Sequence, residues 1–120
     1  MKTAVVLDTD EFFREFQVFL LSNHGYRVLT PERAEDFTPE WVRQHDPDLL
    51  VTEVILPGGN GFELVRKLRH MAGVRCSIIM FTVLGARARA IAAGADAFVQ
   101  KPILRDAYLS TIRDLTKDEP

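Results

Sequence analysis

The chain has 120 residues, of which 47% are hydrophobic, and a formal net charge of −2. This length suits one domain that can bury roughly two thirds of the surface of its unfolded form. Basic residues are scattered among acidic ones, so the sequence shows no nucleic-acid-binding surface. A single cysteine, Cys76, excludes an internal disulfide, and neither a secretory signal nor a membrane-spanning segment is visible. We therefore expect one soluble domain over residues 1–120, in the reducing cytoplasm.

Five short apolar runs predict β-strands. They are rich in β-branched and aromatic residues, which is typical of strands buried on both faces. The runs cover residues 4–7, 27–29, 49–52, 78–81 and 97–99.

Helical patterns separate these strands. Apolar residues at three- and four-residue spacing predict a first helix from Phe12 to Leu20, with Gly25 as a stop signal. Thr38 and Pro39 are typical of a helix start and predict a short second helix that ends near His45. A short alanine-rich helix is expected over residues 86–93. Two further apolar stripes predict the third and last helices, on Leu64, Val65, Leu68 and Met71 and on Tyr108, Leu109, Ile112 and Leu115.

Alternating strands and helices with short connections predict an α/β fold. Such connections are right-handed and give a doubly wound (βα)5 domain with a five-stranded parallel sheet. We expect the flavodoxin-like strand order 2-1-3-4-5, in which ligands bind beyond the carboxyl ends of the first and third strands.

Polar residues follow four of the predicted strands. Asp8 follows the first strand, Glu53 the third, Thr82 the fourth and Lys101 the fifth. Because the carboxyl ends of parallel strands lie at one edge of a sheet, we expect these four side chains to converge. The three histidines lack neighbouring ligands at metal-binding spacing, so we expect surface positions for them and no metal cluster.

Several short motifs together resemble the receiver domain of response regulators in two-component signalling. They are Pro47-Asp48 before the third strand, the segment from Leu56 to Leu64, Gly94-Ala95-Asp96 and Lys101-Pro102. The resemblance covers nearly the whole chain, although residues 82–101 are shorter than usual in this family by about one helical turn.

The resemblance implies roles for individual positions. In that family an acid pair after the first strand binds magnesium, an aspartate after the third accepts a phosphoryl group, and a hydroxyl and a lysine contact that group. Asp8 matches the first acid, Thr82 the hydroxyl and Lys101 the lysine, and Phe98 falls at a switch aromatic. Two positions depart from the pattern, since Thr9 replaces the second acid and Glu53 the acceptor.

These departures predict a degenerate receiver that does not depend on phosphorylation. Thr9 removes charge from the magnesium position, so we expect no cofactor and at most weak magnesium binding. The additional methylene of Glu53 misplaces its carboxylate for phosphoryl transfer and moves the charge towards Thr82 and Lys101, where it can imitate a phosphorylated aspartate. An equally weighted interpretation is that Glu53 and Lys101 form a purely structural ion pair. Asp8, in turn, can simply bind backbone donors at a helix start.

We thus expect a non-enzymatic protein-interaction module. Its partner would be a sensor kinase, an output domain, another receiver or a second copy of the chain, with no nucleic acid and no membrane bound. One alternative is a working receiver modified on Glu53. Another is a flavin- or nucleotide-binding flavodoxin-like domain, which the acidic run from Asp8 to Glu11 disfavours because it would repel phosphate.

Overall fold

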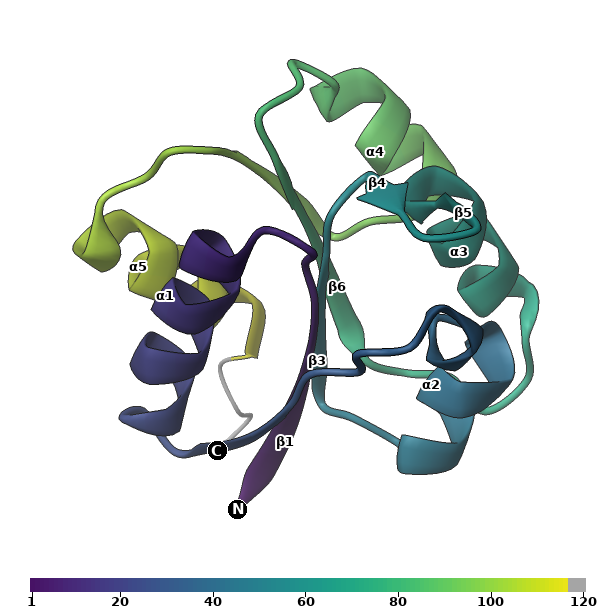
Figure 1. Ribbon diagram of the computed structural model, residues 1–120, viewed down its shortest axis with the longest axis horizontal. Coiled ribbons are helices and arrows are strands. Elements are labelled where there is room, and N and C mark those ends of the chain that lie inside the picture. The colour runs from purple at the N-terminus through teal and green to yellow at the C-terminus, as the bar shows by residue number, and fades with distance from the viewer. Residues whose placement is uncertain (117–120) are drawn as a thin grey trace.

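The computed structural model describes residues 1–116, and its main feature is a five-stranded parallel sheet (Figure 1). The strand order is β2-β1-β3-β6-β7, which is the predicted order 2-1-3-4-5 once a small separate hairpin is left out of the count. All four pairings in this sheet are parallel. The strands are β1 (Lys2–Leu7), β2 (Tyr26–Leu29), β3 (Leu49–Thr52), β6 (Ser77–Thr82) and β7 (Ala97–Gln100).

Helices cover both faces of this sheet. Helices α1 (Glu11–Ser22) and α5 (Arg105–Thr116) lie on one face, and α2 (Pro39–His45), α3 (Gly61–His70) and α4 (Arg87–Ala93) lie on the other (Figure 1). Side chains alternate along a strand, so each strand supplies both layers of the core. In β1, Ala4 and Val6 pack with α1 and α5, whereas Val5 and Leu7 pack on the opposite side. The doubly wound α/β prediction is therefore confirmed.

Polar caps and a glycine set the helix boundaries. The Thr38 hydroxyl accepts a hydrogen bond from the backbone N–H of Trp41, which confirms the predicted start of α2. Helix α4 ends at Gly94, whose φ of 116° lies in the left-handed region that favours glycine. Asp10 caps α1 through the backbone N–H of Phe13.

Two short elements were not predicted. A hairpin of β4 (Ile55–Leu56) and β5 (Gly59–Asn60) follows β3, and a 3₁₀ turn, η1 (Ala34–Asp36), precedes α2. The Pro57-Gly58 turn joins the hairpin strands, and Gly58 supplies the positive φ of 76° at its second position. Strands of two residues are too short to show periodicity, which is why the sequence pattern does not reveal them.

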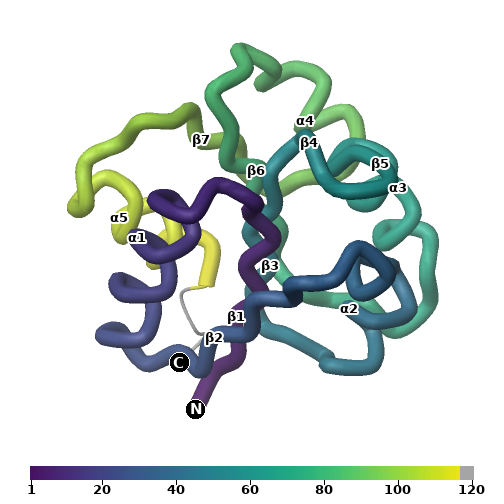
Figure 2. Tube along the Cα trace, in the orientation of Figure 1, coloured from purple at the N-terminus to yellow at the C-terminus, as the bar shows by residue number. Residues whose placement is uncertain are grey.

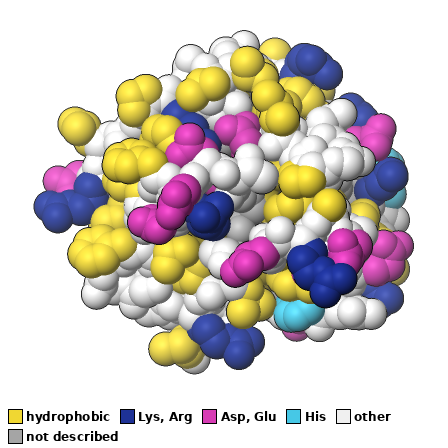
Figure 3. Space-filling model, in the orientation of Figure 1, with side chains coloured by type: hydrophobic (Ala, Val, Ile, Leu, Met, Phe, Trp, Pro, Cys, Tyr) yellow, Lys and Arg dark blue, Asp and Glu magenta, His cyan; other side chains and the backbone are white. Residues whose placement is uncertain are grey.

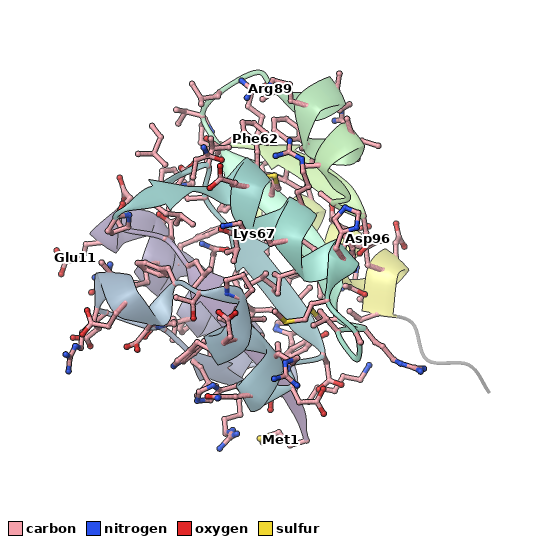
Figure 4. The ribbon with its side chains drawn as sticks, turned by 90° about the vertical axis from the view of Figure 1, so that its right-hand side faces the viewer. Met1, Glu11, Phe62, Lys67, Arg89 and Asp96 are labelled. Atoms are coloured by element: carbon pink, nitrogen blue, oxygen red, sulfur yellow. The ribbon has the colours of Figure 1, made fainter. Side chains whose placement is uncertain are left out.

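Helix α4 is anchored by arginines as well as by its alanines. Ala90 is fully buried, while the Arg89 guanidinium lies 4.3 Å from the ring centre of Phe62 on α3 (Figure 4). The Arg87 guanidinium lies 5.4 Å from the ring centre of Phe98 in β7. Such cation–π contacts compensate for the small side chains of this helix.

Charges of both signs are mixed on the surface. On the face shown in Figure 3, basic and acidic side chains are interspersed, and hydrophobic side chains gather over α1 and α5 at the left and over α4 at the top. Within residues 1–116, no helix combines the length and the apolar character needed to cross a membrane.

Candidate functional site at the carboxyl edge of the sheet

The connections that follow β1, β3, β6 and β7 meet at one end of the sheet. Figure 2 shows them at the top of the trace, where the chain leaves each strand for the next element. This arrangement places the residues after these strands at one edge, as the sequence predicts.

Lys101 is the centre of the site. Its Nζ lies 2.8 Å from Oδ2 of Asp8 and 3.0 Å from Oε1 of Glu53, and only 2% of its side chain is exposed. The ammonium also lies 4.4 Å from the ring centre of Phe13 and 5.3 Å from that of Phe81. One buried cation thus joins two carboxylates and is flanked by aromatic rings.

Asp8 makes more contacts than the lone-acid interpretation predicts. Its Oδ1 accepts from the backbone N–H of Asp10 at 3.0 Å, and its Oδ2 accepts from Nε2 of Gln17 at 3.2 Å as well as from Lys101. Burial raises the pKa of Asp8, whereas the hydrogen bond from Lys101 acts in the opposite direction. Asp8 does bind a backbone donor at the start of α1, as that interpretation predicts, but its contacts with Lys101 and Gln17 show that it does not serve the helix start alone.

Both carboxylate oxygens of Glu53 have protein donors. Its Oε1 accepts from Lys101, and its Oε2 accepts from the backbone N–H of Val54 at 2.5 Å. The backbone N–H of Glu53 donates to the carbonyl of Leu7 at 2.9 Å, which ties this position to β1. The side chain is 12% exposed, so the carboxylate is partly shielded from water. The Glu53–Lys101 ion pair that the sequence suggests is therefore present.

The other predicted site residues have different surroundings. Thr82 is buried, and its hydroxyl accepts from the backbone N–H of Leu84 at 3.3 Å. Thr9 is exposed on the β1–α1 connection. Phe98 is 5% exposed and belongs to the core under α3 and α4, as core packing predicts. The direct contacts therefore join Asp8, Glu53 and Lys101.

Sequence reasoning missed Gln17, Phe13 and Tyr108 as parts of this site. The sequence pattern places Phe13 and Tyr108 in apolar stripes, and both do pack in the core layer of α1 and α5. Gln17 carried a usable signal, since a polar residue four positions after Phe13 falls on the core-facing side of the helix. A buried amide requires partners, and Asp8 and Tyr108 supply them.

The two acids of the site, Asp8 and Glu53, are both paired with Lys101. Residues 1–116 contain no group of three or more His, Cys, Asp or Glu side chains that could hold a metal, and all three histidines are exposed. A cavity of about 400 Å³ opens beside Asp8 and Thr9, and Arg14 lines it. The Arg14 guanidinium donates to the carbonyl of Asp8 at 3.2 Å. Glu32 lines the cavity as well, so charges of both signs surround it, and weak magnesium binding at this edge stays a prediction.

A flavodoxin-like sheet with an acid–lysine cluster at its carboxyl edge is the arrangement that the resemblance to receiver domains implies. The family model described as the response regulator receiver domain matches residues 4–113, and the chain belongs to this family. This result confirms the resemblance seen in the sequence and does not favour the flavin- or nucleotide-binding alternative.

Relatives and solved structures agree with this assignment. The chain is 31% identical over 106 residues to the transcriptional regulatory protein AfsQ1 of Streptomyces coelicolor, covering 86% of this chain and 46% of that protein. It is 32% identical over 120 residues to the phosphate regulon transcriptional regulatory protein PhoB of Rhizobium meliloti, covering 97% and 52%. The chain thus spans about half the length of these relatives.

The fold has a close structural counterpart in a two-component response regulator from Clostridium difficile. The two chains superpose with a TM-score of 0.85 and share 20% sequence identity. The superposition covers 98% of this chain and 97% of the other. At this identity the likeness shows the fold alone.

Proposed function

We propose that this domain is an atypical receiver, a protein-interaction module that works without phosphorylation and carries Glu53 at the phospho-acceptor position. The observation that carries the proposal is the position of Lys101, which bonds Asp8 and Glu53 at the same time. In this proposal the cluster holds the domain in one signalling conformation.

The charges of the cluster support this proposal. Lys101 is the residue expected to meet an incoming phosphoryl group, yet its ammonium already has two carboxylate partners at hydrogen-bond distance. Phosphoryl transfer depends on positioning and on neutralising charge. Glu53 already holds this lysine, and Thr9 replaces the second acid. Lys101 therefore contributes little to positioning a phosphoryl group or to neutralising its charge.

The environment of Glu53 supports the loss of acceptor chemistry. Both of its carboxylate oxygens accept hydrogen bonds, one from Lys101 and one from the backbone of Val54. These bonds hold the carboxylate in one orientation, whereas phosphoryl transfer requires the attacking oxygen to lie in line with the phosphorus atom. Thr9 also removes one carboxylate from the magnesium position. We therefore expect phosphorylation of Glu53 to be very slow or absent.

The biological context is part of the proposal. The two relatives named above are transcriptional regulatory proteins roughly twice as long as this chain, so an output domain is one natural partner, and a sensor kinase or another receiver is a second. The scattered charges of both signs in the sequence, also seen on the face shown in Figure 3, support a protein partner over nucleic acid. We place the domain in the cytoplasm, where two-component regulators meet their kinases.

A phosphorylation assay tests the proposal directly. Wild type, Glu53→Gln and the double variant Thr9→Asp/Glu53→Asp are incubated with a small-molecule phosphodonor and Mg²⁺, and intact mass is recorded. We expect no added phosphoryl group on wild type and one on the double variant, because the latter restores both the acceptor and the metal ligand. Addition of one phosphoryl group to wild type but not to Glu53→Gln would instead show that Glu53 is a working acceptor.

A further inference from the structure

Gln17 is a buried amide in the middle of α1. It is one of the buried residues of α1 and has no exposed surface. A buried amide is costly unless its donors and its acceptor are all satisfied. Here all of them are, and the partners connect two parts of the fold that are far apart in the sequence.

The hydrogen bonds of Gln17 run from the site to the last helix. Its Nε2 donates to Oδ2 of Asp8 and to the carbonyl of Phe13, both at 3.2 Å. Its Oε1 accepts from the hydroxyl of Tyr108 on α5 at 2.8 Å. Tyr108 is 1% exposed, and burial raises its pKa, so the hydroxyl stays protonated and available as a donor.

Chemistry permits one direction for this chain of bonds. An ionised carboxylate only accepts hydrogen bonds, so Gln17 has to present its NH₂ group to Asp8. The carbonyl of the amide then faces Tyr108, whose hydroxyl has to donate. The Tyr108 hydroxyl therefore keeps the NH₂ group of Gln17, and not its carbonyl oxygen, facing Asp8.

We propose that Gln17 and Tyr108 are positioning residues that hold the Asp8 carboxylate on Lys101 and connect the Lys101 cluster to helix α5. This inference rests on the proposed function, since it says how the cluster is kept in one arrangement. With Gln17 and Lys101 on Oδ2 and the backbone of Asp10 on Oδ1, protein donors satisfy the carboxylate on both oxygens. In this proposal the amide contributes a hydrogen bond to Asp8, and the phenol holds the amide in the orientation that makes this bond.

The chain offers a matched control for Tyr108. Tyr26 also donates its hydroxyl to α5, namely to the hydroxyl of Thr116 at 3.1 Å, but it lies at the start of β2. Tyr26→Phe and Tyr108→Phe each remove one hydroxyl that joins α5 to the rest of the fold. Only the second removes a bond in the chain that reaches Asp8.

The test uses NMR on the unphosphorylated protein, for wild type, Tyr108→Phe, Gln17→Leu and Tyr26→Phe. The readouts are the side-chain carboxyl resonance of Asp8 and the ammonium resonance and solvent exchange of Lys101. We expect Tyr108→Phe and Gln17→Leu to shift both resonances and to speed exchange of the Lys101 ammonium hydrogens roughly tenfold, equivalent to about 1.4 kcal/mol. Tyr26→Phe should leave these signals unchanged.

The outcomes separate a positioning role from a structural one. If Tyr108→Phe lowers stability but leaves Asp8 and Lys101 unchanged, Tyr108 serves packing alone and the inference is overturned. Equal shifts in the Tyr26→Phe control would mean that any loosening of α5 disturbs the site, which also overturns it. Should Gln17→Leu fail to fold, Tyr108→Phe decides the question. None of these readouts involves phosphorylation, so failure here is distinct from failure of the proposed function.

Discussion

Replacing Lys101 with methionine removes one buried charge and keeps much of the side-chain volume. It leaves Asp8, which is 4% exposed, and Glu53, whose side chain is 12% exposed, without their cation. Removing one partner from a buried ion pair costs about 3–5 kcal/mol. Asp8 fits this case, while Glu53 is nearer to solvent and adds less. We expect a loss of about 3–5 kcal/mol, out of a total stability of about 5–15 kcal/mol for a domain of ordinary stability.

Urea unfolding at neutral pH measures this loss. With a denaturant dependence of about 1–3 kcal/mol per molar urea, the unfolding midpoint of Lys101→Met should fall by roughly 2 M. The matched control is Lys67→Met, because Lys67 is 63% exposed and lies 3.9 Å from Glu63. That exposed pair should contribute less than about 0.5 kcal/mol.

Second-site variants test the reason for the loss. Adding Asp8→Asn to Lys101→Met should recover more stability than adding Glu53→Gln, because Asp8 is the more deeply buried carboxylate. A loss below about 1 kcal/mol in Lys101→Met would refute the reasoning, since it would place the cation in an environment as well solvated as the surface. Equal recovery by the two second-site changes would show that burial does not set the cost.

Three further predictions concern single positions. Burial raises the pKa of Asp8 above its ordinary value of 3.8, so the folded state binds the carboxyl proton more readily than the unfolded state does. The stability of wild type relative to Asp8→Asn should therefore fall as pH rises from 3.8 towards neutrality, and urea titrations that show a rise would contradict this. Burial also raises the pKa of Cys76 from 9.0 to about 11, so at pH 8 the thiolate fraction of the folded protein is roughly a hundredfold lower than that of the unfolded chain. A thiol reagent should label Cys76 quickly only after unfolding, and rapid labelling of the native protein would refute the prediction. A Cβ at Gly61 would overlap the carbonyl oxygen of Glu53, whereas a Cβ at Gly85 would meet open space. Gly61→Ala should therefore lower the urea midpoint and Gly85→Ala should not. Equal midpoints would count against close packing between Gly61 and the backbone of Glu53.

Local patterns carried enough information for most of the fold. The run 49–52 matches β3 at both ends, and the other four predicted strands lie inside observed strands that extend one or two residues further. The hairpin of β4 and β5 was missed because two residues cannot display a period. Its turn is set by Pro57 and Gly58, and its position after β3 depends on a hydrogen bond from the backbone N–H of Gly61 to the carbonyl of Val54.

The candidate site was partly predictable. Parallel strands end at one edge, so the sequence alone places Asp8, Glu53, Thr82 and Lys101 near one another. Which of them touch is a different question, because an ångström or two decides between a hydrogen bond and a separation. The roles of these residues in phosphoryl chemistry stay predictions, as does the weak magnesium binding.

The sequence by itself determined the class of fold, the edge that carries the polar residues, and the two departures at Thr9 and Glu53. Periodicity and chain order suffice for these, since they depend on neighbours in sequence and on the fixed direction of parallel strands. Only the tertiary structure decided that Lys101 joins both carboxylates and that Gln17 connects Asp8 to Tyr108. Gln17 and Tyr108 are 91 positions apart, and their contact depends on how α1 and α5 pack on the sheet, which local spacing does not encode.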